Sequence, residues 1–192
     1  MRKSDKFGFT LVEAVVVVGI MVILTATLLG YTRTSEQQVV FFKEQSLLIN
    51  ALLRAKAFSI ETFQPGLNPG GERICGWGVH FDKVSGEYII YRDIPPINQL
   101  NPCDQLNTGN YTSGRAGNFE VFKLNGAILK ISDLRSGLAN PATLDVFFKP
   151  PEPSVLFHPD PGSSGDAEIK LELIDGTRAI SIKVNRAGQV TF

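Results

Sequence analysis

The fold of this chain is decided by one stretch near its start, 6-KFGFTLVEAVVVVGIMVIL-24. A single carboxylate, Glu13, interrupts the apolar run. The run then continues from Ala14 to about Tyr31, and these eighteen residues contain no charged side chain. As a helix they would span about 27 Å, close to the thickness of the hydrocarbon core of a bilayer. A charged side chain in lipid costs a few kcal/mol and is usually functional, so the position of Glu13 indicates a function.

Two common kinds of N-terminal segment fit a basic start followed by an apolar run, but neither explains the carboxylate. A secretory signal peptide has a shorter apolar stretch and a small-residue cleavage site, for which Thr25 and Thr27 are a poor match. A signal anchor fits the length, with the positive start of the chain on the cytoplasmic side. Both kinds of segment would work equally well with an apolar residue in place of Glu13.

Cleavage after Gly8 would give the carboxylate a partner. Phe9 would then carry a free amino group about 6 Å of helix rise from Glu13. The positive end of the helix dipole lies at the same place and favours a nearby carboxylate. The pair can form within one chain or between two chains. Since each group is costly in lipid without its partner, a pair between chains would favour association inside the membrane.

Residues 6–13 resemble the type III signal of type IV pilins and of type II secretion pseudopilins. The resemblance implies that a prepilin peptidase cuts after Gly8 and methylates Phe9, and that Glu13 guides assembly into a filament. One position differs from many pilins. Gly30 stands where they carry a proline, and glycine loosens a helix without the steric clash of proline.

The helix is expected to continue beyond the apolar run. Residues 32–63 contain no proline or glycine, and Pro65-Gly66 follows them. An apolar stripe recurs there at helical spacing, which predicts packing against a folded body. The stripe consists of Leu47, Leu48, Ala51, Leu52, Ala55 and Phe58. The sequence thus predicts four parts: a leader at 1–8, a transmembrane and assembly helix at 9–31, an amphipathic continuation at 32–63 and a head at 64–192.

The head is expected to be an antiparallel β structure, because short turns separate segments of strand-like alternation. The expected turns are Lys83–Gly86, Asn125-Gly126, Asp175-Gly176 and Asn185–Gly188. Asn125-Gly126 in particular predicts a hairpin between Phe119–Leu124 and Ala127–Ser132. Two proline-rich stretches, 94–102 and 149–165, predict surface loops.

These elements predict an α+β fold class with a pilin-like arrangement. A long N-terminal helix, transmembrane in its first half, would pack its second half on an antiparallel β-sheet head. The end of the head, where residues 178–182 precede a turn at Gly188 and a last strand, resembles the GspH/FimT-type minor pseudopilins.

The two cysteines, Cys75 and Cys103, are a disulfide candidate if the head is exported to an oxidising compartment. Two unpaired thiols are the alternative, since sequence cannot fix the pairing. A zinc site is not expected, because His80 and His158 form no short-spaced cluster with the cysteines. His158 is expected to be a solvated loop residue. No hydrolase, zinc-protease or phosphate-binding motif is present, so we expect no enzyme activity, cofactor, metal or small-molecule substrate.

The charge distribution bears on nucleic-acid binding. The formal net charge is zero, so no overall field attracts the protein to DNA or to anionic lipid. A basic group near the C-terminus is a weak candidate for phosphate contacts, because some minor pilins bind DNA. It consists of Lys170, Arg178, Lys183 and Arg186. Glu168, Glu172 and Asp175 lie between them and favour a mixed, solvated face instead.

The sequence therefore predicts a structural subunit rather than an enzyme. Its expected partners are other pilin or pseudopilin subunits, a prepilin peptidase and the inner membrane, with the head on the periplasmic side. Two alternatives stay open. The first is a minor pilin that binds DNA for uptake. The second is a signal-anchored, exported binding or enzymatic domain, which would tolerate an apolar residue at position 13.

Overall fold

The computed structural model describes residues 10–61, 74–95, 103, 108–111, 114, 116–151, 154–160 and 165–192. They form an α+β protein with an apolar N-terminal helix and antiparallel sheets. The chain divides into two compact units, Met1–Val40 and Phe41–Phe192. The expected leader at 1–8 and the expected new terminus Phe9 lie outside the described residues.

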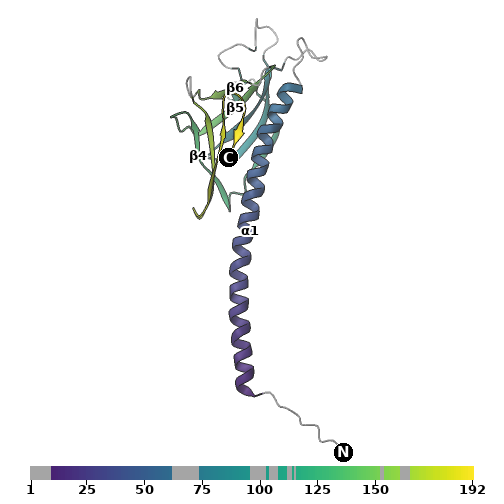
Figure 1. Cartoon of the computed structure of the whole chain (residues 1–192). Coiled ribbons are helices and arrows are strands. Elements are labelled where there is room, and N and C mark those ends of the chain that lie inside the picture. The colour runs from purple at the N-terminus through teal and green to yellow at the C-terminus, as the bar shows by residue number, and fades with distance from the viewer. Residues whose placement is uncertain are drawn as a thin grey trace, which may run out of the picture. The chain divides into compact units, whose positions relative to one another are not determined.

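Helix α1 (Leu11–Glu61) contributes to both units and contains no proline (Figure 1). In the first unit, the window Leu11–Leu28 has a mean hydropathy of 2.5 and none of it is buried. By length and composition this segment can cross a membrane, either as an anchor or as a signal sequence.

The strands of the second unit form two antiparallel sheets. Sheet A has the strand order β3 (Ala116–Lys123), β2 (Glu87–Asp93), β1 (Gly76–Asp82), β5 (Thr143–Lys149) and β6 (Ser154–His158). Sheet B has the order β4 (Leu129–Ser136), β7 (Ala167–Leu173), β8 (Ala179–Val184) and β9 (Val190–Thr191). A hydrogen bond from the Val155 amide to the Arg186 carbonyl, 3.0 Å long, links β6 to the turn before β9.

Alternation along sheet A gives it two different faces. One face joins the main core, the large cluster of buried apolar side chains, through Trp77, Val79 and Phe81 of β1 and their neighbours on the other strands. The opposite face, called the outer face below, carries a smaller cluster of Cys75, Tyr91 and Phe147. Figure 1 shows β5 beside the part of α1 that belongs to the second unit.

Side chains of α1 belong to the same main core as both sheets. Those that are fully buried in it are Leu48, Ala51, Leu52 and Ala55. The Ser59 hydroxyl, also buried, donates a 2.7 Å hydrogen bond to the main-chain oxygen of Phe148 on β5. Apolar burial supplies most of the stabilisation at such a contact, and the hydrogen bond satisfies a hydroxyl that water cannot reach.

Three of the four expected turns are confirmed, and the fourth is wrong. The turns at 83–86, 175–176 and 185–188 each join antiparallel neighbours, namely β1 with β2, β7 with β8, and β8 with β9. Asn125-Gly126 makes no hairpin, because β3 belongs to sheet A and β4 to sheet B.

The backbone around Asn125 explains this difference. The Asn125 carbonyl accepts hydrogen bonds from the amides of Ile128 and Leu129, both 2.9 Å long. The φ of Gly126 is not positive, whereas a two-residue type I′ turn needs positive φ at both central residues. The dipeptide therefore turns the chain from one sheet to the other.

The loop expected at 149–165 is also wrong, since it contains strand β6, paired with β5. The prolines that suggested a loop lie beside the strand, where no ladder hydrogen bond is lost. Val155 and Phe157 point into the main core, as period-2 alternation requires. His158, expected in a solvated loop, is accordingly a half-buried residue of β6.

Candidate functional site

The N-terminus of α1 holds the candidate assembly residue. Glu13 lies in the first turn of the helix and is exposed. Its backbone amide donates a 3.3 Å hydrogen bond to the hydroxyl oxygen of Thr10, and the amide of Ala14 donates to the Thr10 carbonyl at 3.2 Å. Thr10 is therefore the N-cap residue of α1, and Glu13 occupies the third helical position.

Sequence reasoning missed the role of Thr10. The spacing Thr10-x-x-Glu13 is the signature of a capping box, in which the cap residue is a serine or threonine and the third helical residue an acid. A carboxylate at this place is also favoured by the helix dipole. The dipole effect gives the Glu13 carboxylate a local structural role in addition to the expected assembly role. The expected processing residues Gly8 and Phe9 lie outside the described residues.

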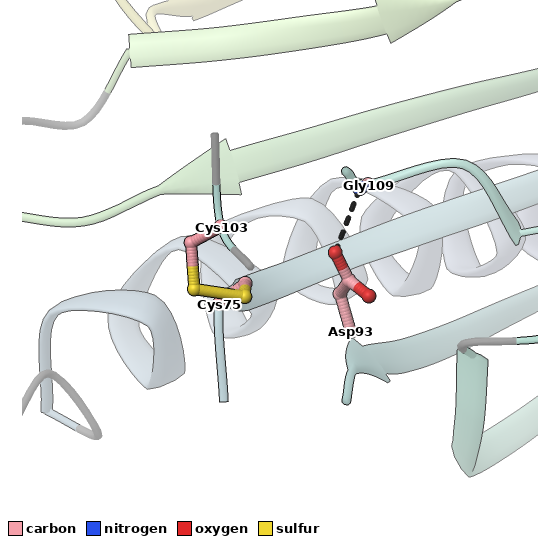
Figure 2. Close-up of a disulfide and its surroundings, with 4 residues drawn as sticks. All are labelled: Cys75, Asp93, Cys103 and Gly109. Carbon is pink, nitrogen blue, oxygen red and sulfur yellow. Dashed lines mark hydrogen bonds between the residues drawn. A yellow bond between two sulfur atoms is a disulfide. The ribbon is translucent and has the colours of Figure 1, made fainter. Parts of the chain in front are cut away.

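The outer face of sheet A carries a second cluster of interest, covered by Cys103 and residues 108–111. We call these residues the strap. A disulfide joins Cys103 to Cys75, with 5.1 Å between their α-carbons (Figure 2). The carboxylate of Asp93 accepts a 2.9 Å hydrogen bond from the amide of Gly109, as Figure 2 shows. The strap is thus tied to sheet A both covalently and through a buried acid.

Ionisable side chains from four strands hold the strap. The Tyr91 hydroxyl of β2 donates to the Gly109 carbonyl, and the Tyr111 amide donates to Asp145 of β5 at 3.0 Å. On β6, His158 Nε2 donates to the Thr108 carbonyl at 3.0 Å. These contacts place side chains beneath the strap that are far apart in the sequence.

His80 of β1 completes this network. Its Nδ1 lies 2.5 Å from a carboxylate oxygen of Asp145, and its ring stacks on Tyr111 with 4.1 Å between the centroids. Burial, and then the nearby carboxylates Asp145 and Asp93, raise the pKa of Tyr91 well above its usual range. The Tyr91 hydroxyl therefore remains a neutral donor to the strap.

A histidine paired with an aspartate is also a common part of catalytic sites, but two features indicate a structural role here. Both members of the pair contact Tyr111 of the strap, Asp145 through the Tyr111 amide and His80 through ring stacking, and the pair is buried with His80 only 7% exposed. Among the described residues, no group of three or more His, Cys, Asp or Glu side chains could hold a metal ion. Asp93 and Asp145 were missed by sequence reasoning, although an acid inside an apolar strand such as 143-TLDVFFK-149 is a recognisable signal.

Three of the four basic candidates for DNA binding lie beside acidic residues, and the fourth lies over an aromatic ring. On sheet B, Lys183 stands opposite Glu168, and Lys170 stands opposite Asp133. Arg186 forms a 2.8 Å ion pair with Asp160. Arg178 lies over the ring of Phe42 of α1, 5.7 Å from its centroid. The structure therefore does not assemble the four into a separate basic patch.

Comparisons of the chain with family models, curated proteins and solved structures find no match. The resemblance of residues 6–13 to the pilin signal thus stays a prediction.

Proposed function

We propose that this chain is a structural subunit, a minor pilin or pseudopilin, of a type IV pilus, a type II secretion pseudopilus or a competence pseudopilus. The observation that carries the proposal is the exposed Glu13 carboxylate in the first turn of an exposed apolar helix of membrane length. The proposed partners are other subunits of the filament, a prepilin peptidase and the inner membrane, with the head on the periplasmic side.

The charge of Glu13 supports association. Among the described residues, no basic side chain forms an ion pair with Glu13, and the described residues up to Leu28 are exposed. In lipid, both this carboxylate and the surrounding apolar surface would need partners, the carboxylate because an unpaired charge is costly there. The amino group of Phe9, freed by cleavage after Gly8 in the same subunit or in a neighbour, would provide the opposite charge.

The packing of α1 in the second unit supports the pilin-like arrangement. Leu48, Leu52 and Ala55 share the main core with strands of both sheets. A helix that packs one part on a β head and exposes an apolar part suits a subunit that joins others through its helix. Secretion of a soluble enzyme would require no such exposed segment in the mature protein.

Mass analysis of the protein extracted from membranes tests the proposal. We expect the mass of residues 9–192 plus one methyl group, with the methyl on the N-terminal Phe9. An intact Met1, or cleavage beyond residue 25, would contradict it and would favour the signal-anchored or secreted alternatives. Replacement of Gly8 by a bulky residue is the matched control, because it should leave membrane insertion intact and abolish processing.

A further inference from the structure

We propose that docking of the strap and closure of the Cys75–Cys103 disulfide are coupled, so that the outer face of sheet A is completed only where a thiol oxidant is present. The inference concerns maturation of the head and does not depend on the proposed assembly into filaments. It follows from how each cysteine is held.

Cys75 is fixed by the sheet itself. It is 2% exposed, it directly precedes β1, and its amide donates a 2.9 Å hydrogen bond to the Asp93 carbonyl at the end of β2. The cysteines are 28 residues apart in sequence, but the pairing of β1 with β2 already brings Cys75 to Asp93. Closing the bond therefore fixes a loop of only about ten residues, from Asp93 to Cys103, at a corresponding cost in chain entropy.

The contacts of the strap offset this cost. Gly109 is held by Asp93 and Tyr91, Tyr111 by Asp145, and Thr108 by His158. All four contacts act on main-chain atoms within eight residues of Cys103, so they raise the effective concentration of its thiol beside Cys75. Because coupling between two equilibria is reciprocal, closure of the disulfide must favour these same contacts by the same factor.

Docking also covers apolar surface. Tyr91 and Phe147 are fully buried on the outer face. A β-carbon at Gly109, whose φ is +78°, would lie 2.4 Å from Cγ of Phe147, so the strap backbone presses directly on that ring. An undocked strap would leave both aromatic rings facing water, which makes the undocked head prone to association.

The oxidation step needs a disulfide oxidant such as glutathione disulfide. One cysteine thiolate attacks a sulfur of the oxidant, which releases one thiol and forms a mixed disulfide. The second cysteine thiolate then displaces the other thiol and forms Cys75–Cys103. The protein loses two electrons and two protons, and the oxidant is reduced to two thiols. The second displacement is the step that strap docking assists.

The equilibrium constant for oxidation of the full chain by glutathione, measured in detergent by alkylation and mass analysis, tests the coupling. Gly109→Ala blocks docking by steric clash, and Asp93→Asn removes the charge that holds the strap amide. We expect either change to lower the constant at least tenfold. Glu87→Gln is the matched control, because this acid of the same strand forms a surface pair with Lys123 and should change the constant less than twofold. Constants equal to that of the wild type in both test variants would overturn the proposal.

Hydrogen exchange provides the reciprocal measurement. In Cys103→Ser, the amides of Gly109 and Tyr111 should exchange at least tenfold faster, while those of Val79 and Val146 inside sheet A keep their protection. Unchanged exchange at Gly109 and Tyr111 would overturn the coupling. Exchange of the Val79 and Val146 amides also reports whether Gly109→Ala or Asp93→Asn has disturbed sheet A. Gly109→Ala and Asp93→Asn act through different groups, so either one decides the question if the other unfolds.

Discussion

The hydroxyl oxygen of Thr10 accepts its hydrogen bond from the backbone amide of Glu13, so this cap of α1 uses no atom of the Glu13 side chain. Any residue other than proline at position 13 can donate the same bond. The capping role and the charge at this place can therefore be separated by mutation.

Glu13→Ala should leave the cap in place and abolish filament entry. We expect wild-type amounts of processed protein in the membrane and at least a tenfold loss from the filament fraction, because the apolar helix would lack the charge that pairs between subunits. Immunoblots of the membrane and filament fractions measure both quantities. Thr10→Ala is the control, since it weakens the helix end by about 0.5–2 kcal/mol and keeps the carboxylate. Normal assembly of Glu13→Ala would contradict the proposed function.

Packing of α1 in the second unit can be tested at two adjacent leucines. Leu52 is fully buried in the main core, whereas Leu53 is 47% exposed. Leu52→Ala should lower the free energy of unfolding by about 2–5 kcal/mol, because it removes buried methyl groups and leaves a cavity. Leu53→Ala should have a much smaller effect. Urea unfolding in detergent, followed by the fluorescence of Trp77, measures both. Equal effects would show that the helix does not pack on the head as described.

The β7–β8 turn should show a pH dependence with a defined sign. The Thr177 hydroxyl, and then the Thr177 amide, donate hydrogen bonds to Asp175 and lower the pKa of that carboxyl below its usual range. A lowered pKa adds stability that is present above the unfolded-state pKa and is lost as the pH falls through the folded-state pKa. Thr177→Val should raise the pKa of Asp175 towards its ordinary value. Carbon-detected NMR titration measures it, with Asp82 at the end of β1 as an unchanged reference, and an unaltered Asp175 titration would contradict the assignment.

Charge reversal on sheet B tests the DNA alternative. In the double variant Arg178→Glu, Lys183→Glu, we expect DNA affinity at about 0.15 M salt to equal that of the wild type, since Glu168 stands opposite Lys183 and the Arg178 guanidinium lies over the Phe42 ring. Gel-shift titration with duplex DNA measures the affinity. A tenfold loss in the variant would instead support a role in DNA capture. Lys130→Glu, on the same sheet and outside the basic group, controls for a general change of charge.

Local patterns predicted some turns correctly and others wrongly, and the difference has a physical basis. At Asp175-Gly176 the strands on both sides alternate towards the same core, so the turn and the packing agree. At Asn125-Gly126 the turn chemistry allowed a hairpin, but β3 pairs with β2 in sheet A and β4 pairs with β7 in sheet B. The turn propensity of two residues is a local preference, and the pairing of each strand within its own sheet overrode it.

The sequence by itself determined the apolar helix, the place of Glu13 on it and the β character of the head, and it identified Cys75 and Cys103 as a disulfide candidate. These features depend on composition and on spacing along short segments. Only the tertiary structure decided that β3 and β4 separate into two sheets, that β6 forms between prolines, and that His80, Asp93, Asp145 and His158 converge beneath the strap. Such convergence joins residues from four strands, and no local pattern specifies which strands become neighbours. Their order is set by the burial of apolar faces throughout the head.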